Sequence, residues 1–289
     1  MLPMQEVRFA YDDAGNPSTP YIKTATPATM LVEELMLKAN TIVGEVLARH
    51  MERVGTAGGM FRVHDNPDAE KYQTFRSFVK SLGYEIPKRS STKTLQDLID
   101  RIGVTPIADV VMPLLLRTLA KATYQAVPSG HFGLGFSAYA HFTSPIRRYP
   151  DLIAHRLLMT LGDKKPLYTK RDLGRIAEHA TEREIIASKM EREATKQLQV
   201  AYIATRREEI WNVFVTGISD NGLFAEELTT KTSGFIAYRT LKGDHFMPNR
   251  TNTEARGKKT GVTYRLGDRL RVKITKINTE RNQVDFEIV

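Results

Sequence analysis

The 289-residue sequence contains no cysteine, which excludes disulfide bonds, thiolate zinc sites and iron–sulfur clusters. No apolar run approaches the roughly 20 residues that a membrane-spanning helix needs. Glu6 and Arg8 interrupt the N-terminal residues, so no signal-peptide pattern is present there. These absences predict a cytoplasmic or organelle-matrix protein, and we expect no membrane partner.

Acidic residues are in the minority, since 42 lysines and arginines face 33 aspartates and glutamates and give a net charge of +9. An excess of positive charge favours an acidic partner. Nucleic acid is the leading class, and a ribosome or an anionic membrane surface is the alternative. The hydrophobic fraction of 41% is ordinary for a chain with a folded core, and the length suggests about two domains.

Helical periodicity dominates the first 207 residues. Apolar positions recur three and four residues apart and predict helices over residues 29–49, 69–82, 90–102, 106–126 and 170–207. An alternating stretch at residues 7–11, followed by a turn rich in aspartate and glycine, predicts one strand of a hairpin. Residues 61–64 predict a short extended piece.

The apolar period changes to two after about Glu208. Short alternating stretches, separated by glycine and polar turns, lie at residues 211–215, 222–225, 234–238, 267–274 and 283–288. Strands of this length and spacing predict a small barrel. The expected fold class is therefore α+β: a mostly helical part over residues 1–207, followed by a five-stranded barrel over residues 208–289.

The most distinctive segment lies between the predicted helices over residues 106–126 and 170–207. It is GHFGLGFSAYAHFTSPIRRYPDLIAHR, residues 130–156. Apolar spacing after the Ser144-Pro145 turn signal predicts a helix that starts near Pro145, with Arg147 and Arg148 in its first turn. Cations there oppose the helix dipole, and a bound phosphate would remove the conflict. The alternative is a solvated pair of surface arginines.

This segment resembles the signature of the catalytic RNB domain of the ribonuclease II and ribonuclease R family. The resemblance implies processive 3′→5′ hydrolysis of single-stranded RNA, with release of 5′-mononucleotides. It also implies that Arg147 contacts the scissile phosphate as a catalytic residue, supported by Arg148 and Tyr149. We assign Tyr139 and His141 of the same segment to RNA contact, although a histidine among aromatics is more often a hydrogen-bonded core residue.

Two helical segments extend the resemblance. MLVEELMLKAN, residues 30–40, resembles a helix of the RNB domain in which a glutamate faces the RNA channel, and Glu34 is favoured over Glu33. Compensation of the helix dipole explains both glutamates equally well. HATEREIIASKMEREA, residues 179–194, resembles the closing helix of that domain, and Glu191 and Arg192 best match the residues placed near the RNA path.

The predicted barrel resembles an S1 domain, an RNA-binding barrel of the OB type. Residues 239–273 are strongly basic, and in a groove they would hold phosphates while bases stack on exposed rings. The RNA contacts expected from the barrel are Phe224, Tyr238, Arg269, Arg271 and Lys273, with Phe235 as a further ring. Ala237 and Asn221 stand where S1 domains often have a histidine and an aromatic residue, so one donor and one ring are missing.

Metal ligands are the missing part of this resemblance. The RNB family binds Mg²⁺ through a dense aspartate run, and that run lies before the segment matched here. Asp12, Asp13, Asp97 and Asp100 do not reproduce it, and no third ligand accompanies His131 and His141. We therefore expect Mg²⁺ as cofactor without ligands in this chain, and single-stranded RNA plus a second chain with the N-terminal half of the RNB domain as partners. The alternative is a non-catalytic RNA-binding protein derived from the family.

Overall fold

The computed structural model describes residues 6–14, 17–55, 58–103, 105, 107–163, 165–241 and 243–289. These residues form two compact units. The first contains residues 25–101 and 114–188, and the second contains the N-terminal hairpin, residues 102–113 and residues 189–289. The division into domains between residues 207 and 208 stays a prediction, because the compact units separate inside a helix.

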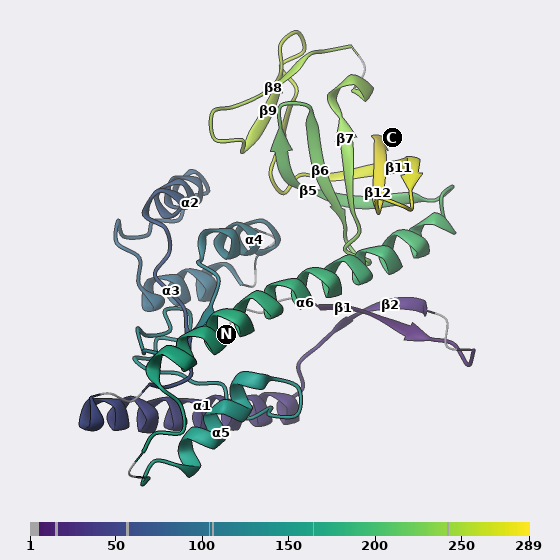
Figure 1. The fold of residues 1–289 in the computed structure, drawn as a ribbon. Helices are drawn as coiled ribbons and strands as arrows, with labels where there is room; N and C mark the ends of the chain where they lie inside the picture. Colours follow the sequence, from purple (N-terminus) through teal and green to yellow (C-terminus); the bar gives the residue numbers. More distant parts are fainter. Residues whose placement is uncertain are drawn as a thin grey trace. The chain divides into compact units, whose positions relative to one another are not determined.

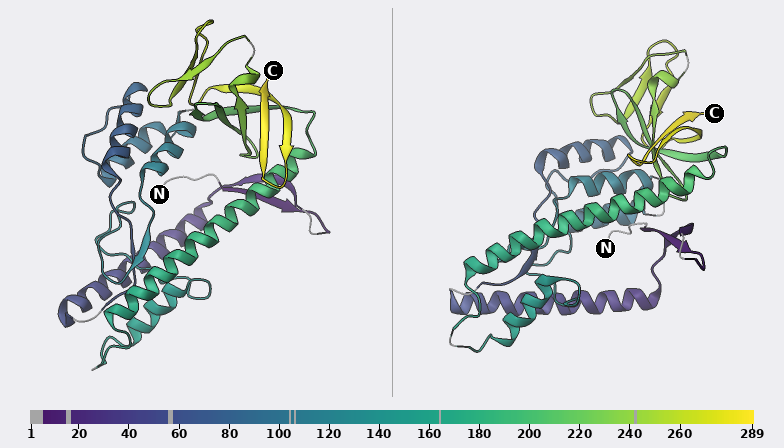
Figure 2. Two further views of the ribbon diagram at one scale, coloured as in Figure 1. Left: turned by 45° about the horizontal axis from the view of Figure 1, so that its top comes forward. Right: turned by 45° about the vertical axis from the view of Figure 1, so that its right-hand side comes forward.

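The first unit is built on helices α1 (Pro27–Val54) and α5 (Tyr149–Met159), which lie side by side (Figures 1 and 2). The helices that follow α1 in the chain are α2 (Ala69–Ser81), α3 (Thr92–Ile102) and α4 (Ala108–Thr118). Strands β3 (Phe61–Val63) and β4 (Thr123–Gln125) pair antiparallel. Fully buried side chains such as Phe61, Leu47 and Ile153 join α1, β3, β4 and α5 in one core.

Helix α1 begins where the sequence supplies a capping box. The Thr26 hydroxyl accepts from the Thr29 amide, the Thr29 hydroxyl accepts from the Thr26 amide, and Pro27 occupies the first helical position. Gly55 ends the helix at a φ of +72°, which a residue with a side chain rarely adopts. The prediction of a helix over residues 29–49 is confirmed, with extra residues at both ends.

The predicted helix over residues 106–126 is wrong in its second half, because α4 ends at Thr118 and the chain continues into β4. Threonine and tyrosine favour strands, and the edge of β3 offers Thr123 and Tyr124 backbone hydrogen bonds. The pairing leaves Tyr124 only 6% exposed. The predicted helices over residues 69–82 and 90–102 are confirmed as α2 and α3.

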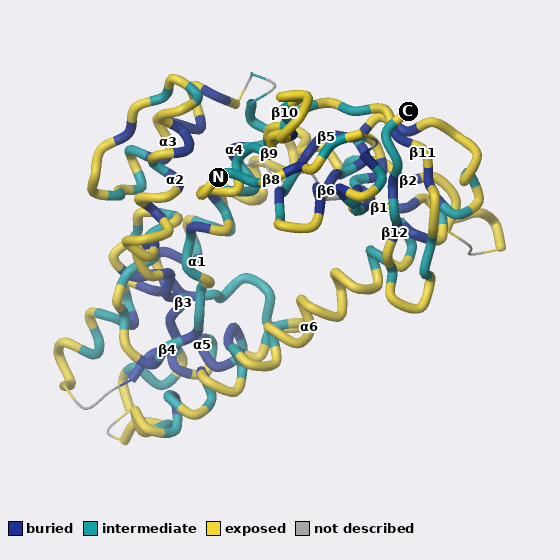
Figure 3. The backbone as a smooth tube through the Cα atoms, turned by 90° about the horizontal axis from the view of Figure 1, so that it is seen from above, coloured by how far each residue is buried: buried dark blue, intermediate teal, exposed yellow. Residues whose placement is uncertain are grey.

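Helix α6 (Lys170–Ala204) passes from the first unit into the second, and residues 185–194 are exposed all round (Figure 3). Its apolar side chains are buried only toward the ends, at Leu173 in the first unit and at Val200 and Ile203 in the second. The mixed charges of the middle keep that stretch solvated. Neither α6 nor any other helix in the described part of the chain is long and apolar enough to cross a bilayer.

The N-terminal strands of the second unit are β1 (Glu6–Tyr11) and β2 (Pro17–Lys23), which pair antiparallel. This confirms the predicted hairpin strand, although residues 15 and 16 of its turn lie outside the described residues. The Phe9 ring meets the Tyr202 ring of α6 edge-on, with the centroids 6.3 Å apart. The Arg206 guanidinium lies 4.0 Å from the centroid of the same tyrosine ring.

The barrel has the predicted five strands. They are β5 (Ile210–Ser219), β6 (Gly222–Glu227), β7 (Ser233–Ala237), β11 (Arg269–Asn278) and β12 (Gln283–Ile288), closed in the order β11-β12-β7-β6-β5. Alternation along each strand turns Val213, Leu223, Ile236 and Phe286 into the core. The expected α+β fold class is confirmed.

A second, three-stranded sheet separates β7 from β11 in the chain, and the sequence did not predict it. A 3₁₀ turn, η1 (Tyr238–Thr240), leads into strands β8 (Phe246–Pro248), β9 (Glu254–Gly257) and β10 (Thr263–Arg265). Strands this short carry too few residues for a period of two to be read. The Phe246 ring joins this sheet to the barrel core by packing between Tyr238 and Tyr264.

Closure of the barrel depends on glycine at residue 234. A Cβ there would lie 2.1 Å from Cε2 of the buried Phe286 ring. Gly234→Ala should therefore lower the free energy of unfolding of the barrel by about 1–3 kcal/mol, measured through the fluorescence of Trp211 in urea. Gly174→Ala on α6 is the control, since nothing lies within 4 Å of a Cβ there. An unchanged Trp211 transition in Gly234→Ala would contradict this packing.

Candidate nucleic-acid interface

A sharp turn precedes α5 and carries the two adjacent arginines. The amides of Arg147 and Arg148 donate to the Ser144 carbonyl oxygen at 3.3 and 3.0 Å. The predicted helix start near Pro145 is wrong, because α5 begins at Tyr149 and Arg148 is its N-cap residue in an extended conformation. Both arginines thus precede the first helical turn, and the expected conflict with the helix dipole does not arise.

A buried carboxylate in the first turn of α5 fixes this geometry. Asp151 is 0% exposed, and its Oδ1 accepts from the Ser144 amide at 2.8 Å and from Arg148 Nη2 at 2.7 Å. A carboxylate at this position also lies at the positive end of the helix dipole. Asp151 therefore neutralises Arg148, whereas Arg147 is exposed and has no ion-pair partner among the described residues.

A third guanidinium reaches the same region from β3. The Arg62 side chain is only 14% exposed and forms a two-point ion pair with Glu184 of α6, in which Nη2 lies 2.9 Å from Oε1. Its guanidinium carbon also lies 4.6 Å from the centroid of the Tyr124 ring. Charge pairing on one side and ring stacking on the other hold this guanidinium in one position.

The Tyr124 hydroxyl is hydrogen-bonded to His141. The hydroxyl lies 2.8 Å from His141 Nδ1 and has no other hydrogen-bond partner among the described residues. Burial raises the pKa of Tyr124 to about 12, so this hydroxyl keeps its proton, and we assign it as the donor to Nδ1. Nε2 then carries the histidine proton and offers an N–H to a ligand.

His141 is a neutral donor in a cationic setting. Burial, followed by the charges of Arg148 and Arg62, lowers the pKa of His141 to about 2, and Arg147 acts in the same direction. A histidine that cannot take up a proton donates through Nε2 without adding another charge. The arrangement of guanidiniums around a neutral N–H donor suits the oxygens of a phosphate group.

Tyr139 supports this arrangement from inside the core. It is 5% exposed, and its hydroxyl accepts from Asn40 Nδ2 at 3.0 Å. Asn40 Oδ1 accepts in turn from the Phe142 amide at 2.9 Å, which fixes the strand-like segment around His141. The Tyr139 ring meets the His141 ring edge-on, so the contact is with His141 and the ring is not presented to a ligand in this conformation.

The other two histidines of this region form core contacts. His64 accepts at Nδ1 from the Gly133 amide at 2.8 Å, and its Nε2 lies 2.7 Å from the Ala120 carbonyl oxygen. Burial, together with His64 and Arg62, lowers the pKa of His131 to about 4. No three potential ligands gather around a metal position anywhere in the described part of the chain.

On the barrel, the exposed rings lie on β6 and β7. Phe224 is 48% exposed, faces Phe235 across the strand pair and packs on it with the ring centroids 5.2 Å apart. Tyr238 is 8% exposed and belongs to the barrel core, so the structure does not place it beside Phe224 as an open stacking ring. The predicted cations Arg269, Arg271 and Lys273 occupy every second position of β11 and lie on its outer face. Lys273 pairs with Glu287 at 3.3 Å.

Two family patterns match the sequence: the RNB domain over residues 1–163 and the S1 RNA binding domain over residues 206–289. The chain belongs to the RNB family. It is 34% identical over 293 residues to ribonuclease R of Thermotoga maritima, with 98% of this chain and 40% of that protein covered. Ribonuclease R of Escherichia coli is 28% identical over 276 residues, with 91% and 33% covered.

The fold is also similar to that of apo Mycoplasma genitalium RNase R. The TM-score is 0.90 at 27% sequence identity, and the alignment covers 100% of this chain and 46% of that one. The chain thus spans less than half the length of each of these relatives.

Within the RNB domain, the structure gathers only part of the predicted set. Arg147 and Arg148 lie close enough to His141 for their charges to lower its pKa. Tyr149 follows them at the start of α5 and is 51% exposed. Glu34 is exposed on α1, and Glu191 and Arg192 are exposed on the part of α6 that belongs to the second unit.

Sequence reasoning missed the residues that hold this site in place. They are Arg62, Tyr124, Asp151 and Glu184. A single arginine between Phe61 and Val63 in a buried strand was a usable signal, because an unpaired guanidinium is rarely placed there. An aspartate in the apolar first turn of α5 was another.

Asp151→Ala should destabilise the first unit strongly. It leaves the partly buried Arg148 without its counter-charge and the Ser144 amide without its acceptor, which typically costs about 3–5 kcal/mol. Urea unfolding monitored by circular dichroism measures the loss. Glu85→Ala removes a carboxylate from an exposed ion pair with Lys80 in the same unit and should have a much smaller effect; equal effects would argue against the clamp.

Acid should destabilise the fold through the buried histidines. His131 and His141 have lowered pKa values in the folded protein, so only the unfolded state takes up their protons as the pH falls below about 6.5. Above that pH the free energy of unfolding has its full value. Below it, each histidine lowers the free energy of unfolding by about 1.4 kcal/mol per pH unit. This loss continues down to about pH 4 for His131 and about pH 2 for His141.

His141→Gln should remove one of these two contributions. Urea midpoints between about pH 7 and pH 5 should then depend less steeply on pH than in the unaltered chain. His179→Gln on the exposed face of α6 is the control and should leave the pH dependence unchanged. A His141→Gln variant as sensitive to acid as the unaltered chain would refute the neutral, buried state of His141.

Proposed function

We propose that this chain supplies the phosphate-binding and RNA-guiding part of a 3′→5′ exoribonuclease. The enzyme would hydrolyse single-stranded RNA from its 3′ end and release 5′-mononucleotides. The observation that carries the proposal is the exposed, unpaired guanidinium of Arg147 beside the neutral His141 and the fixed Arg148. The relatives named ribonuclease R and the Mycoplasma genitalium RNase R solved with ribose methylated single-stranded RNA support it.

The reaction explains why a guanidinium is needed at this position. Hydrolysis of a phosphodiester increases the negative charge on the phosphoryl oxygens in the transition state. The planar fork of Arg147 can donate two hydrogen bonds to those oxygens, and the Nε2–H of His141 can donate a third. Asp151, Tyr124 and Glu184 act as positioning residues, because they fix the donors before RNA arrives.

The described residues of this chain do not fit a Mg²⁺ site. The described residues hold no cluster of three carboxylates or histidines, and Asp151 already binds Arg148 and the Ser144 amide. Mg²⁺ prefers several oxygen ligands in near-octahedral geometry. We propose that the cofactor is held by carboxylates outside this chain, and we assign no step here to it.

A polypeptide that carries those carboxylates is the proposed partner, and we propose the cytoplasm as the compartment. On this chain, the docking surface for that polypeptide would be the first turns of α1, where Met30, Leu31, Val32 and Leu35 are 55–63% exposed. Apolar side chains clustered in this way mark an interaction surface. The occupant is the part of the RNB relatives' length that this chain does not span.

Reconstitution tests the proposed function. The chain is mixed with a polypeptide that carries the family's aspartate run, and release of mononucleotides from single-stranded RNA is followed with and without Mg²⁺. We expect release only when all components are present. RNA binding without release in every mixture would leave the non-catalytic RNA-binding alternative.

Arg147→Ala should lower the rate constant of cleavage by about 10²–10³-fold, because it removes charge stabilisation of the transition state. Arg147→Lys should fail as well, since an ammonium cannot reproduce the two-point fork. RNA affinity, measured by fluorescence anisotropy, should change little in either variant because the S1 barrel supplies most of it. The control is Arg175→Ala, which alters an exposed ion pair with Asp172. A parallel fall of affinity and rate would contradict the role of Arg147.

A further inference from the structure

The sheet formed by β8, β9 and β10 has one face turned to the barrel and one turned to solvent. Phe246, Ala255 and Tyr264 belong to the barrel core or pack against it. The opposite face carries Met247, Arg256 and Thr263, which are aligned with one another across the three strands. The sheet is therefore anchored by its apolar face and presents a second face that the barrel strands do not use.

An open hollow of about 590 Å³ lies on this solvent face. Its cationic side is formed by Arg256 and by Lys258 and Lys259 of the β9–β10 turn, and its apolar side by Met247 and Pro248. We refer to this feature as the insert cavity.

The cations of the insert cavity lack counter-ions. Arg256, Lys258 and Lys259 are exposed and have no ion-pair partner within the described part of the chain. The acidic residue in the lining, Glu254, is paired with Arg265 at 3.5 Å. The cavity therefore keeps a net positive charge that an anionic ligand can neutralise.

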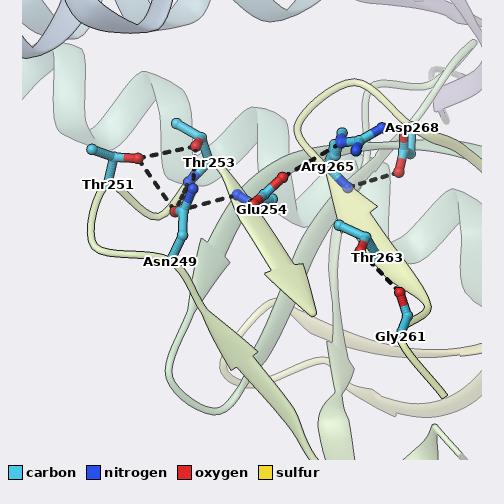
Figure 4. A network of polar contacts seen from close by, with 8 residues as sticks. All are labelled: Asn249, Thr251, Thr253, Glu254, Gly261, Thr263, Arg265 and Asp268. Carbon is cyan, nitrogen blue, oxygen red and sulfur yellow. Dashed lines mark hydrogen bonds and ion pairs between the residues drawn. The ribbon is translucent and has the colours of Figure 1, made fainter. Parts of the chain in front are cut away.

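Side chains hold the β8–β9 turn and the end of β10 in place. Asn249 Oδ1 accepts from the Thr253 amide at 2.9 Å, and its Nδ2 donates to Thr253 Oγ1 at 2.8 Å, which closes the β8–β9 turn (Figure 4). Asp268 Oδ2 accepts from the Arg265 amide at 2.7 Å at the end of β10 (Figure 4).

Asp244 holds the β9–β10 turn that carries the lysines. Its carboxylate accepts from the amides of His245, Lys259 and Thr260 at 2.7, 2.8 and 2.7 Å, and also from the Thr260 hydroxyl. Burial opposes its ionisation, but the Thr260 hydroxyl and these amides outweigh that effect and lower the pKa of Asp244. Gly257 is needed for this approach, since a Cβ would lie 2.2 Å from Asp244 Oδ2.

We propose that the insert cavity is an RNA-binding site separate from the ring face of β6 and β7, in which Arg256, Lys258 and Lys259 hold backbone phosphates of single-stranded RNA. The inference rests on the proposed function and adds to it a second RNA contact in the S1 domain. The ligand class follows from three cations without an ion-pair partner among the described residues, beside acidic groups that are already bound: Glu254 to Arg265, and Asp244 to the amides of the turn.

The first test removes charge from the insert cavity. Arg256→Gln/Lys258→Gln is compared with Lys276→Gln/Arg281→Gln, which deletes two exposed cations at the far end of β11 and in the β11–β12 turn. The affinity of the full chain for a single-stranded oligonucleotide is measured over a range of salt concentrations. At about 0.7 per phosphate contact, the slope of log K against log salt should fall by about 1.4 in the cavity variant, and the affinity at about 0.1 M salt by about 25-fold.

The second test separates position from net charge. Asp244→Ala makes the chain more positive, so charge alone predicts tighter RNA binding. Loss of the clamp instead frees the turn that carries Lys258 and Lys259, and the insert cavity predicts weaker binding. A tighter complex would overturn the proposal.

The outcomes distinguish this inference from the proposed function. If the unaltered chain fails to bind single-stranded RNA, the proposed function is refuted and the inference with it. If the unaltered chain binds RNA and the cavity and control variants have equal salt slopes, only the proposed RNA site in the insert cavity is refuted. The expected result is a reduced slope in the cavity variant and an unchanged slope in the control.

Discussion

The buried ion pair between Asp151 and Arg148 is the interaction on which the RNB site depends. Asp151 is fully buried, and its Oδ1 accepts hydrogen bonds from both the Arg148 guanidinium and the Ser144 amide. A buried carboxylate is stable only when it is paired and hydrogen-bonded, so the turn and the first turn of α5 must form together. The consequence is asymmetric: Arg148 is neutralised and fixed, and Arg147 beside it remains free to bind an external anion.

Neighbouring side chains also hold the other hydrogen-bond donors of the site in place. Glu184 and the Tyr124 ring immobilise Arg62, and the Tyr124 hydroxyl is hydrogen-bonded to Nδ1 of His141. Burial and the nearby guanidiniums keep His141 neutral, so its Nε2–H donates without adding charge. Groups that are already oriented lose little entropy when a phosphate binds, which is the source of electrostatic preorganisation.

Much of the architecture could be read from the sequence, because helices and barrel strands leave strong periodic signals. The helix over residues 106–126 failed at its second half because periodicity cannot reveal that β3 needs a partner strand. The predicted start of α5 was wrong because the helix was expected to begin near Pro145, whereas the chain makes a turn there and the helix begins after Arg148. The three-stranded insert was missed because its strands are too short to show alternation.

The residues of the signature segment could be predicted from the sequence, but the residues that hold them in place could not. Arg147 and His141 stand in a segment whose composition is unusual by itself, whereas Arg62 and Glu184 are 122 positions apart in the sequence and meet only in the fold. Tyr139 and Tyr238 were assigned to RNA contact as aromatic residues in suitable segments, and burial places both in cores. Composition identifies a ring, but only packing determines whether its face is open.

The most direct test of the central claim is nuclear magnetic resonance of side-chain N–H groups during titration with a single-stranded RNA oligonucleotide. The account predicts saturable shifts of the Arg147 guanidinium and the His141 Nε2–H signals, with the exposed Arg175 guanidinium unaffected. Saturation of the S1 barrel, seen at the Phe224 ring, with no change at Arg147 or His141 would contradict it.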